Sequence, residues 1–353
     1  MPTESEIIRQ LEDGLELPPL EIRVRELVKA ADTGVDAILD VKTGNKKSFQ
    51  FAAQVKARNT PRAFEESLLR LEYSARKSKS NEPLPLLVVP YFSESQLDQL
   101  ERLELSGIDL SGNGVVCVPG KLLVYRSGKP NQFPESTQSK YAYRGVTSLV
   151  ARAFLCRTRY DSLADIESEI KSRGGTVSLS TISKALKRME SDLIVDRTGQ
   201  LIRLRQADKL LDKLAASYVE PKTTQTVTCA SQKPLSELLA NVVEAQTVVL
   251  SGSSSVDGYA VMGRDAWPVL YTSNVKALRE AWGKNVESTS RFVDFELQQT
   301  DDATVYFDAR MRNDLPYASP VQVYLQLSAG DKRERETALQ VKEFIMDELK
   351  DAE

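Results

Sequence analysis

The chain of 353 residues contains no histidine, and this absence excludes several classes of enzyme. A Ser-His-Asp triad, a Cys-His pair, an H-E-x-x-H zinc site and an HD-type phosphohydrolase all require an imidazole side chain. General base catalysis would therefore fall to a carboxylate, a lysine or a metal-bound water.

Cysteine is scarce, and long apolar runs are missing. Cys117, Cys156 and Cys229 are odd in number and widely separated, so we expect buried small side chains rather than a disulfide framework or a zinc ribbon. No stretch approaches the roughly 20 apolar residues of a membrane span. Residues 1–16 are acidic and lack a signal-peptide core. We expect a cytoplasmic protein with no membrane partner.

Charge is distributed unevenly along the chain. Residues 1–135 carry 18 Lys and Arg against 20 Asp and Glu, residues 140–217 carry 15 against 9, and residues 218–353 carry 14 against 21. A basic block between acidic flanks is typical of a module that contacts DNA, because affinity for the backbone depends on phosphate neutralisation. At this length, with 41% apolar residues, the chain can bury two or three cores.

Acidic and amide side chains lie on two predicted strands near the amino terminus. A strand over residues 35–41 would place Asp36 and Asp40 on one face, and a strand over residues 49–56 would group Gln54 with Lys56. Hard ions such as Mg²⁺ prefer oxygen ligands, and a nearby ammonium can hold or acidify the attacking water. The pattern predicts a site in which Asp36 or Asp40 and Gln54 hold Mg²⁺ and Lys56 places the water.

This arrangement resembles the PD-(D/E)xK restriction-endonuclease-like family, with Gln54 in place of the usual acid. A Gln carbonyl contributes only a dipole to the ion, so the site should hold metal weakly. The Mrr-like branch of these nucleases carries a similar Q-x-K. The alternative is that these residues are solvated polar positions at strand ends. Glu21 and Glu26 are further acidic candidates by position only.

The residues that follow predict a βαβ unit and a more specific resemblance. Residues 62–76 read as an amphipathic helix and residues 83–89 as a buried strand. The D-L-S-G-N turn at residues 109–113 and the R-S-G-K-P-N end at residues 126–131 resemble the nuclease-like domain of bacterial AbiEi-type winged-helix proteins. Those proteins are antitoxins of type IV toxin-antitoxin systems. The resemblance implies a restriction-endonuclease-like α/β domain over residues 1–135, with a cognate toxin or a second copy as partner.

The basic block contains a predicted series of helices followed by a hairpin. An apolar stripe spans residues 140–157, Ser162 caps a second helix, a third begins near residue 178, and residues 196–200 form a turn between strands. This order resembles a winged helix-turn-helix over residues 140–217, whose third helix enters the major groove of double-stranded DNA. The expected DNA contacts are Ser180, Thr181, Ser183, Lys184, Lys187, Arg188 and, at the wing tip, Arg197. The alternative is a docking or dimerisation module with a solvated lysine face.

The last part of the chain is expected to be an interaction module. Residues 218–233 read as a linker, and residues 234–353 resemble the AbiEi-type carboxy-terminal domain, an α+β nucleotidyltransferase-like fold. The best-matched part is residues 319–327 with the charged helix over residues 332–350. The glycine and serine turn at residues 251–255 lacks the Gly-Lys of a P-loop, and Asp257 does not supply a carboxylate pair.

These patterns predict a multi-domain protein of α/β and α+β classes and leave two functions open. The first is a sequence-specific DNA-binding regulator, an antitoxin-like repressor whose nuclease-like domain is degenerate and needs no cofactor. The second is a Mg²⁺-dependent DNA endonuclease that a winged helix delivers to DNA. We favour the first because Gln54 weakens the predicted ion site.

Overall fold

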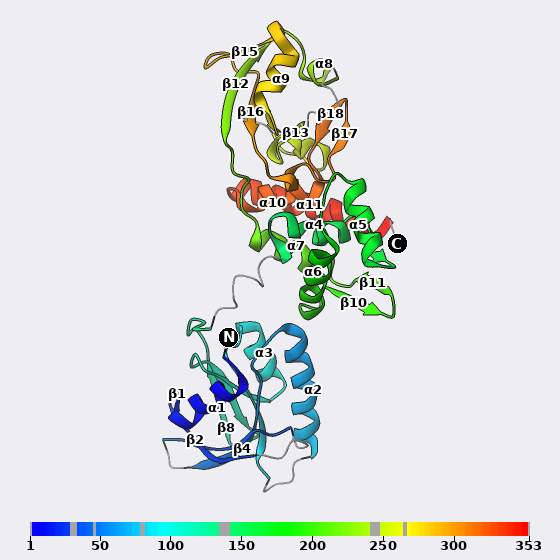
Figure 1. The fold of residues 1–353 in the computed structure, drawn as a ribbon. Helices are drawn as coiled ribbons and strands as arrows, with labels where there is room; N and C mark the ends of the chain where they lie inside the picture. Colours follow the sequence, from blue (N-terminus) through cyan, green and yellow to red (C-terminus); the bar gives the residue numbers. More distant parts are fainter. Residues whose placement is uncertain are drawn as a thin grey trace. The chain divides into compact units, whose positions relative to one another are not determined.

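The computed structural model describes residues 2–28, 34–44, 47–77, 82–133, 142–240, 248–263 and 267–351. The chain divides into two compact units, Met1–Ser136 and Thr137–Glu353 (Figure 1). Each unit combines helices with a sheet. The expected mixed α/β character is therefore confirmed at this level.

The first unit is built on an eight-stranded sheet in which strands adjacent in space are also adjacent in sequence. Its strands are β1 (Leu15–Leu17), β2 (Leu20–Leu27), β3 (Ala37–Lys42), β4 (Ser48–Val55), β5 (Leu84–Val89), β6 (Ser106–Asp109), β7 (Gly114–Val118) and β8 (Leu122–Arg126). β4, β5 and β6 run parallel, and the other neighbours are antiparallel. The predicted βαβ unit is confirmed, because α2 (Pro61–Lys77) connects the parallel strands β4 and β5.

Helices cover both faces of this sheet. α1 (Glu4–Asp13) buries Ile7 in a core that includes Val88. On the other face, α2 buries Phe64 and α3 (Glu94–Arg102) buries Leu97 in a core that includes Leu87. Leu87 and Val88 are consecutive residues of β5, so their side chains point to opposite faces of the sheet and each enters a different core.

The second unit begins with a series of helices and a hairpin, as expected from the basic block, together with one short additional strand. They are η2 (Gly145–Thr147), α4 (Ser148–Phe154), β9 (Arg159–Tyr160), α5 (Leu163–Ser172), α6 (Leu179–Ser191), β10 (Val195–Thr198), β11 (Leu201–Leu204) and α7 (Ala207–Ser217). Ser162 and Ser178 cap α5 and α6, which confirms the predicted helix starts. The sequence did not predict β9, which extends the hairpin to three strands by pairing with β11.

The rest of the second unit contains two further sheets and a pair of long helices. Its elements are β12 (Gln225–Ser231), α8 (Leu235–Ala240), β13 (Val248–Leu250), η3 (Ser253–Gly258), β14 (Val269–Thr272), α9 (Val275–Trp282), η4 (Gly283–Asn285), β15 (Val286–Ser288), β16 (Phe295–Gln299), η5 (Ala303–Val305), β17 (Arg310–Arg312), β18 (Leu315–Tyr317), α10 (Pro320–Ala329) and α11 (Lys332–Asp351). The larger sheet has the order β13-β14-β16-β12-β15, and β17 pairs with β18.

The expected linker over residues 218–233 is wrong for residues 225–231, which form β12. β12 lies between β16 and β15, so this polar segment is an inner strand of a sheet. A single hydrophobic core contains Leu186 of α6 together with Val321 of α10 and Ile345 of α11. The two segments expected as separate domains therefore fold together. The expected boundaries at residues 135 and 140 lie outside the described residues.

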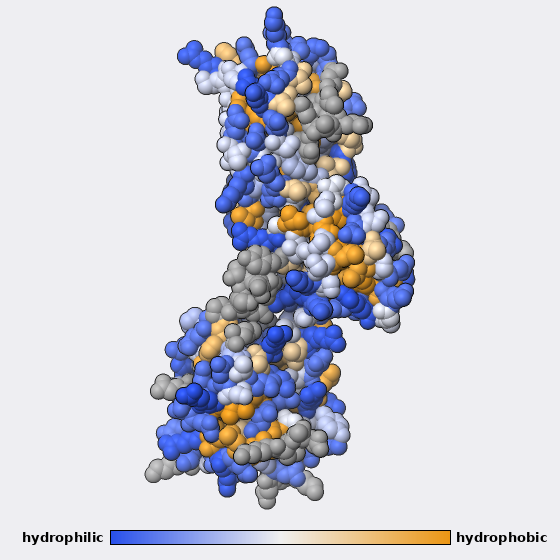
Figure 2. Space-filling view, in the orientation of Figure 1, coloured by the Kyte–Doolittle hydropathy of each residue, from blue (hydrophilic) through white to orange (hydrophobic). Residues whose placement is uncertain are grey.

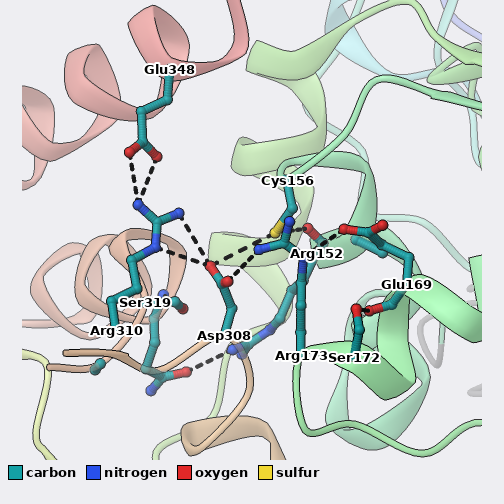
Figure 3. A network of polar contacts seen from close by, with 12 residues as sticks. Arg152, Cys156, Glu169, Ser172, Arg173, Asp308, Arg310, Ser319 and Glu348 are labelled. Atoms are coloured by element: carbon teal, nitrogen blue, oxygen red, sulfur yellow. Dashed lines mark hydrogen bonds and ion pairs between the residues drawn. The ribbon is translucent and has the colours of Figure 1, made fainter. Parts of the chain in front are cut away.

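A polar network also joins the two halves of the second unit (Figure 3). Arg173, which follows α5, donates to Glu169 at 2.7 Å and also to Asp308. Asp308 accepts from Nη2 of Arg310 at 3.2 Å, and Nη1 of Arg310 lies 2.7 Å from Glu348 of α11. Because the carboxylate of Asp308 is buried, these contacts fix α5 against the carboxy-terminal helix.

The three cysteines are free, and their burial agrees with the sequence-based expectation for two of them. Cys117 and Cys229 are buried, whereas Cys156 is partly buried with its Sγ 3.8 Å from Asp308. Burial raises the pKa of the Cys117 and Cys229 thiols, so both remain protonated at neutral pH.

The surface in the view of Figure 2 is mainly hydrophilic, with smaller hydrophobic patches in each unit. Across the described ranges, none of the helices combines the length and the apolar character needed to cross a bilayer.

Candidate nucleic-acid interface and nuclease-like site

Helix α6 has one buried face and one polar face. The inward side chains, as predicted, are Ile182, Ala185, Leu186 and Met189. On the opposite face Ser180, Lys184 and Lys187 are exposed. Neither lysine forms an ion pair with another residue in the described part of the chain. Both ammonium groups are therefore available to an anionic partner.

The first turn of α6 carries a cluster of hydroxyl groups. Ser178 caps the helix, and its Oγ lies 3.0 Å from the hydroxyls of both Ser180 and Thr181. Thr181 and Ser183 are partly buried. The Ser178 cap occupies the N–H of Thr181, and the small side chains around it permit an anion to approach the rest of this helix start closely.

Arg188 differs from the two lysines because it is bound within the fold. Its Nε donates to Asp192 at 2.9 Å, and the Asp192 side chain is fully buried. The same carboxylate accepts from the Tyr143 hydroxyl at 2.7 Å and lies 3.3 Å from the ammonium of Lys213. Lys184 and Lys187 are thus the main cations that α6 presents to solvent.

Arg197 lies on β10, beside the turn of the hairpin. Its Nε is 2.9 Å from Glu190 of α6, so the arginine connects the hairpin to the helix. Gly199 has a φ of +66°, a conformation that glycine adopts without strain, and it allows the tight turn between β10 and β11.

Asp36 is held beside the end of β4. It directly precedes β3, its N–H donates to Ala53 at 2.8 Å, and its carboxylate accepts from the Val55 N–H at 2.7 Å. The acid is therefore close to Gln54 in the ladder, as the sequence predicted. One of its oxygens is already used by the backbone.

Gln54 faces a cavity rather than the two aspartates. The cavity has a volume of about 520 Å³, and Ala52, Gln54, Leu71 and Tyr73 are among its lining residues. Gln54 is buried at 7% exposure. Asp36, Asp40 and Lys56 do not line this cavity.

Asp40 and Lys56 are engaged elsewhere. Asp40 lies 3.7 Å from Arg25 of β2, and Lys56 lies 3.9 Å from Glu4 of α1. Asp36 and Asp40 are four strand positions apart, or about 13 Å, too far to hold one ion together. Within the described ranges no three acidic or cysteine side chains gather as a metal-binding group. The residues predicted for the Mg²⁺ site are thus dispersed.

The register of β2 against β3 separates the two glutamate candidates. Glu26 pairs with Ile38, near the end of the strand where Asp36 lies, whereas Glu21 pairs with Lys42 at the far end. Both side chains are exposed. Of the two glutamates, only Glu26 lies at the same end of the strand pair as Asp36.

The sequence did not single out Asp109, which organises the turn between β6 and β7. This buried carboxylate accepts four hydrogen bonds of 2.9 Å, from the N–H groups of Phe92, Ser111 and Asn113 and from the Asn113 side chain. Burial raises the pKa of Asp109 despite these donors. The D-L-S-G-N spacing was the available signal, because Asp and Asn side chains commonly close turns.

Asn113 joins this turn to the segment after β8. Its Oδ1 accepts from the Lys129 N–H at 2.8 Å, and its Nδ2 donates to the Lys129 carbonyl at 3.2 Å. The two sequence segments that carried the family resemblance therefore meet in space, and their contacts hold the end of the sheet together.

The glycine and serine turn after β13 is packed into the protein. Ser254 Oγ accepts from the Val269 N–H at 2.8 Å, and Ser255 Oγ accepts from the Ala318 N–H at 2.9 Å. The N–H of Gly252 donates to Gln326 of α10, and a side chain at Gly252 would clash with Gln326. These groups bind the fold itself, so the turn does not form an open phosphate cradle.

Comparison of the chain with protein-family models, with curated proteins and with solved structures gave no match.

Proposed function

We propose that this chain is a cytoplasmic, sequence-specific DNA-binding protein that regulates transcription and uses α6 as its recognition helix. The observation that carries the proposal is the outer face of α6, where Lys184 and Lys187 are exposed beside Ser180. Lysines neutralise phosphates, and small hydroxyls permit the helix start to approach the DNA backbone.

The elements around α6 support this assignment. α5 and α6 precede the β10–β11 hairpin, in the order of a winged helix-turn-helix. Arg197 lies next to the hairpin turn, where a wing contacts the flanking backbone or minor groove. The segment of residues 140–217 also has a net positive charge, with 15 basic against 9 acidic residues, whereas residues 1–135 and 218–353 are net negative.

The first unit is proposed to be a degenerate restriction-endonuclease-like domain that mediates assembly and requires no cofactor. Three features support the loss of catalysis: Gln54 replaces an acid, the Asp36 carboxylate binds the Val55 N–H, and Lys56 pairs with Glu4. As in the AbiEi-type antitoxins that the chain resembles, the partner would be a toxin or a second copy. The carboxy-terminal segment would serve as a non-catalytic interaction module.

A Mg²⁺-dependent DNA endonuclease is the second candidate. The observation in its favour is that Asp36 lies beside the end of β4 that bears Gln54, on the antiparallel partner strand. Catalysis would require Lys56 to leave Glu4 and Asp36 to exchange a backbone hydrogen bond for the ion.

One experiment separates the two candidates. The full chain is titrated with labelled duplex DNA at several salt concentrations and is also incubated with supercoiled plasmid and Mg²⁺ or Mn²⁺. A regulator should bind with salt-dependent affinity and leave the plasmid intact. Nicking by wild type that disappears in Lys56→Ala would replace the regulator with the nuclease. Absence of binding even at low salt would contradict both.

A further inference from the structure

A cavity of about 350 Å³ lies within the second unit, where α4 and the end of α7 meet η5. Its lining includes Ser148, Arg152, Ser217, Tyr218, Thr304 and Leu325. All of these belong to segments whose side chains share the core of this unit, so the cavity is part of one folded body. Its volume suits a small metabolite.

The positive charge of Arg152 on the wall of this cavity is buried and forms no ion pair at contact distance with a described residue, although the charge of Asp302, which also lines the cavity, favours the charged guanidinium. Arg152 is 3% exposed, and its Nη1 donates to the Thr304 carbonyl at 3.0 Å and to Gln322 Oε1 at 2.9 Å. Both acceptors are neutral, Nε has no acceptor, and no described carboxylate lies within ion-pair distance. Figure 3 shows this guanidinium near the polar network that links α5 to α11.

The guanidinium remains charged, and its neutral partner is fixed. Burial lowers the pKa of Arg152 to about 10, still far above neutral pH. Gln322 Nε2 donates to the Tyr218 hydroxyl at 3.3 Å, so its Oε1 is kept on Arg152. A buried cation with only neutral partners is costly unless an anion completes the site.

We propose that this cavity binds a compact metabolite through one carboxylate or phosphate group, which pairs with Arg152. A guanidinium presents several N–H donors in a plane and matches both anions. The exposed lining residues have mixed charge, since they include Lys222, Glu220 and Asp301, and this disfavours a polyanion such as a nucleic-acid backbone. The site goes beyond the proposed DNA-binding function and does not depend on it.

The helices next to the cavity also contact other parts of the second unit. Arg152 lies on α4, and α4 packs against α6. Gln322, which contacts Arg152, lies on α10. An anion bound to Arg152 would therefore lie beside α4, which packs against the proposed recognition helix, and close to α10 of the carboxy-terminal segment.

Calorimetric titration of the full chain tests the site, with inorganic phosphate and succinate as separate probes. We expect saturable binding of at least one probe and a loss of affinity of at least about tenfold in Arg152→Met, because a charge-assisted contact is removed. Binding of phosphate alone assigns a phosphate ester, and binding of succinate alone assigns a carboxylic acid. If neither probe binds wild type, the proposal is wrong.

If Arg152→Met does not fold, a second pair of variants tests the site: one substitution that fills the cavity and a control substitution next to it that does not. Ser217 lines the cavity and is partly exposed, whereas Ala216 beside it is exposed and does not line it. Ser217→Trp should abolish probe binding while Ala216→Trp retains it, with circular dichroism confirming that both are folded. Binding by Ser217→Trp at wild-type affinity would place the anion elsewhere and overturn the proposal.

Discussion

The Nε atom of Arg188 lies 2.9 Å from the carboxylate of Asp192, one helical turn away at the end of α6. Tyr143 donates to the same buried carboxylate from 49 residues earlier in the sequence. This contact separates Arg188, which supports the fold, from Lys184 and Lys187, which face solvent.

We predict that Arg188→Ala destabilises the second unit. Removing this donor leaves the buried Asp192 with Tyr143 and Lys213, so the free energy of unfolding should fall by about 1–3 kcal/mol. Urea denaturation followed by circular dichroism measures the change. Lys184→Ala is the matched control on the same helix and should leave the unfolding midpoint unchanged. Equal effects of the two substitutions would show that the Asp192 contact does not stabilise the fold.

The double substitution Lys184→Ala and Lys187→Ala should weaken duplex binding at least tenfold. Two phosphate contacts are lost, so the slope of log affinity against log salt should also become shallower by about two. Fluorescence anisotropy at several salt concentrations measures both quantities. The control removes two exposed lysines elsewhere in the unit, Lys276 and Lys284. If the folded double variant keeps the wild-type slope, α6 is not the DNA-binding helix.

Asp109→Asn should destabilise the first unit, most strongly at low pH. The amide replaces one of two acceptor oxygens, so two of four hydrogen bonds are lost, at about 1–3 kcal/mol. Because burial raises the folded-state pKa of Asp109, the folded protein holds this proton more tightly than the unfolded chain. This contribution is greatest below the ordinary aspartate pKa of about 4 and declines as pH rises through the raised value.

Denaturant unfolding of wild type and Asp109→Asn across this pH range isolates the effect, because the other titrating groups are common to both proteins. The gap in unfolding free energy between them should narrow as pH rises. A gap that widens with pH would mean that the four donors, and not burial, determine the pKa of Asp109.

Gln54→Glu should strengthen Mg²⁺ binding, because it adds a carboxylate to the wall of the cavity that Gln54 faces. Calorimetric titration with MgCl₂ measures the effect. Gln50→Glu is a matched control, since Gln50 pairs with Asp40 on the same two strands. A larger gain from Gln50→Glu would identify Asp40 as the ligand in place of Asp36.

The carboxy-terminal segment should transfer no nucleotide. The hydroxyls of Ser254 and Ser255 already accept backbone N–H groups, and two-metal transfer needs paired carboxylates that the turn does not supply. Incubation with labelled nucleoside triphosphates should leave protein and RNA unlabelled. Labelling that disappears in Asp257→Ala would assign a transferase.

The sequence alone determined the elements that depend on local interactions. Ser162 and Ser178 cap helices through residues three positions away, and the apolar spacing of α6 identified its buried face. The sequence also predicts that the strands now seen as β3 and β4 are neighbours, which brings Asp36, just before β3, close to Gln54 on β4. Such features need only a few neighbouring residues, and the printed sequence contains all of them.

Only the tertiary structure decided which of these residues are free to act. The polar composition of β12 favours a linker, yet strand pairing with β15 and β16 overrides that preference. Arg188 looked equivalent to its lysine neighbours until Asp192 and Tyr143 met it in the fold. Arg152 on α4 meets Thr304 and Gln322 from more than 150 positions away. Side-chain partners of this kind depend on chain folding over long distances, which no local pattern in the sequence encodes.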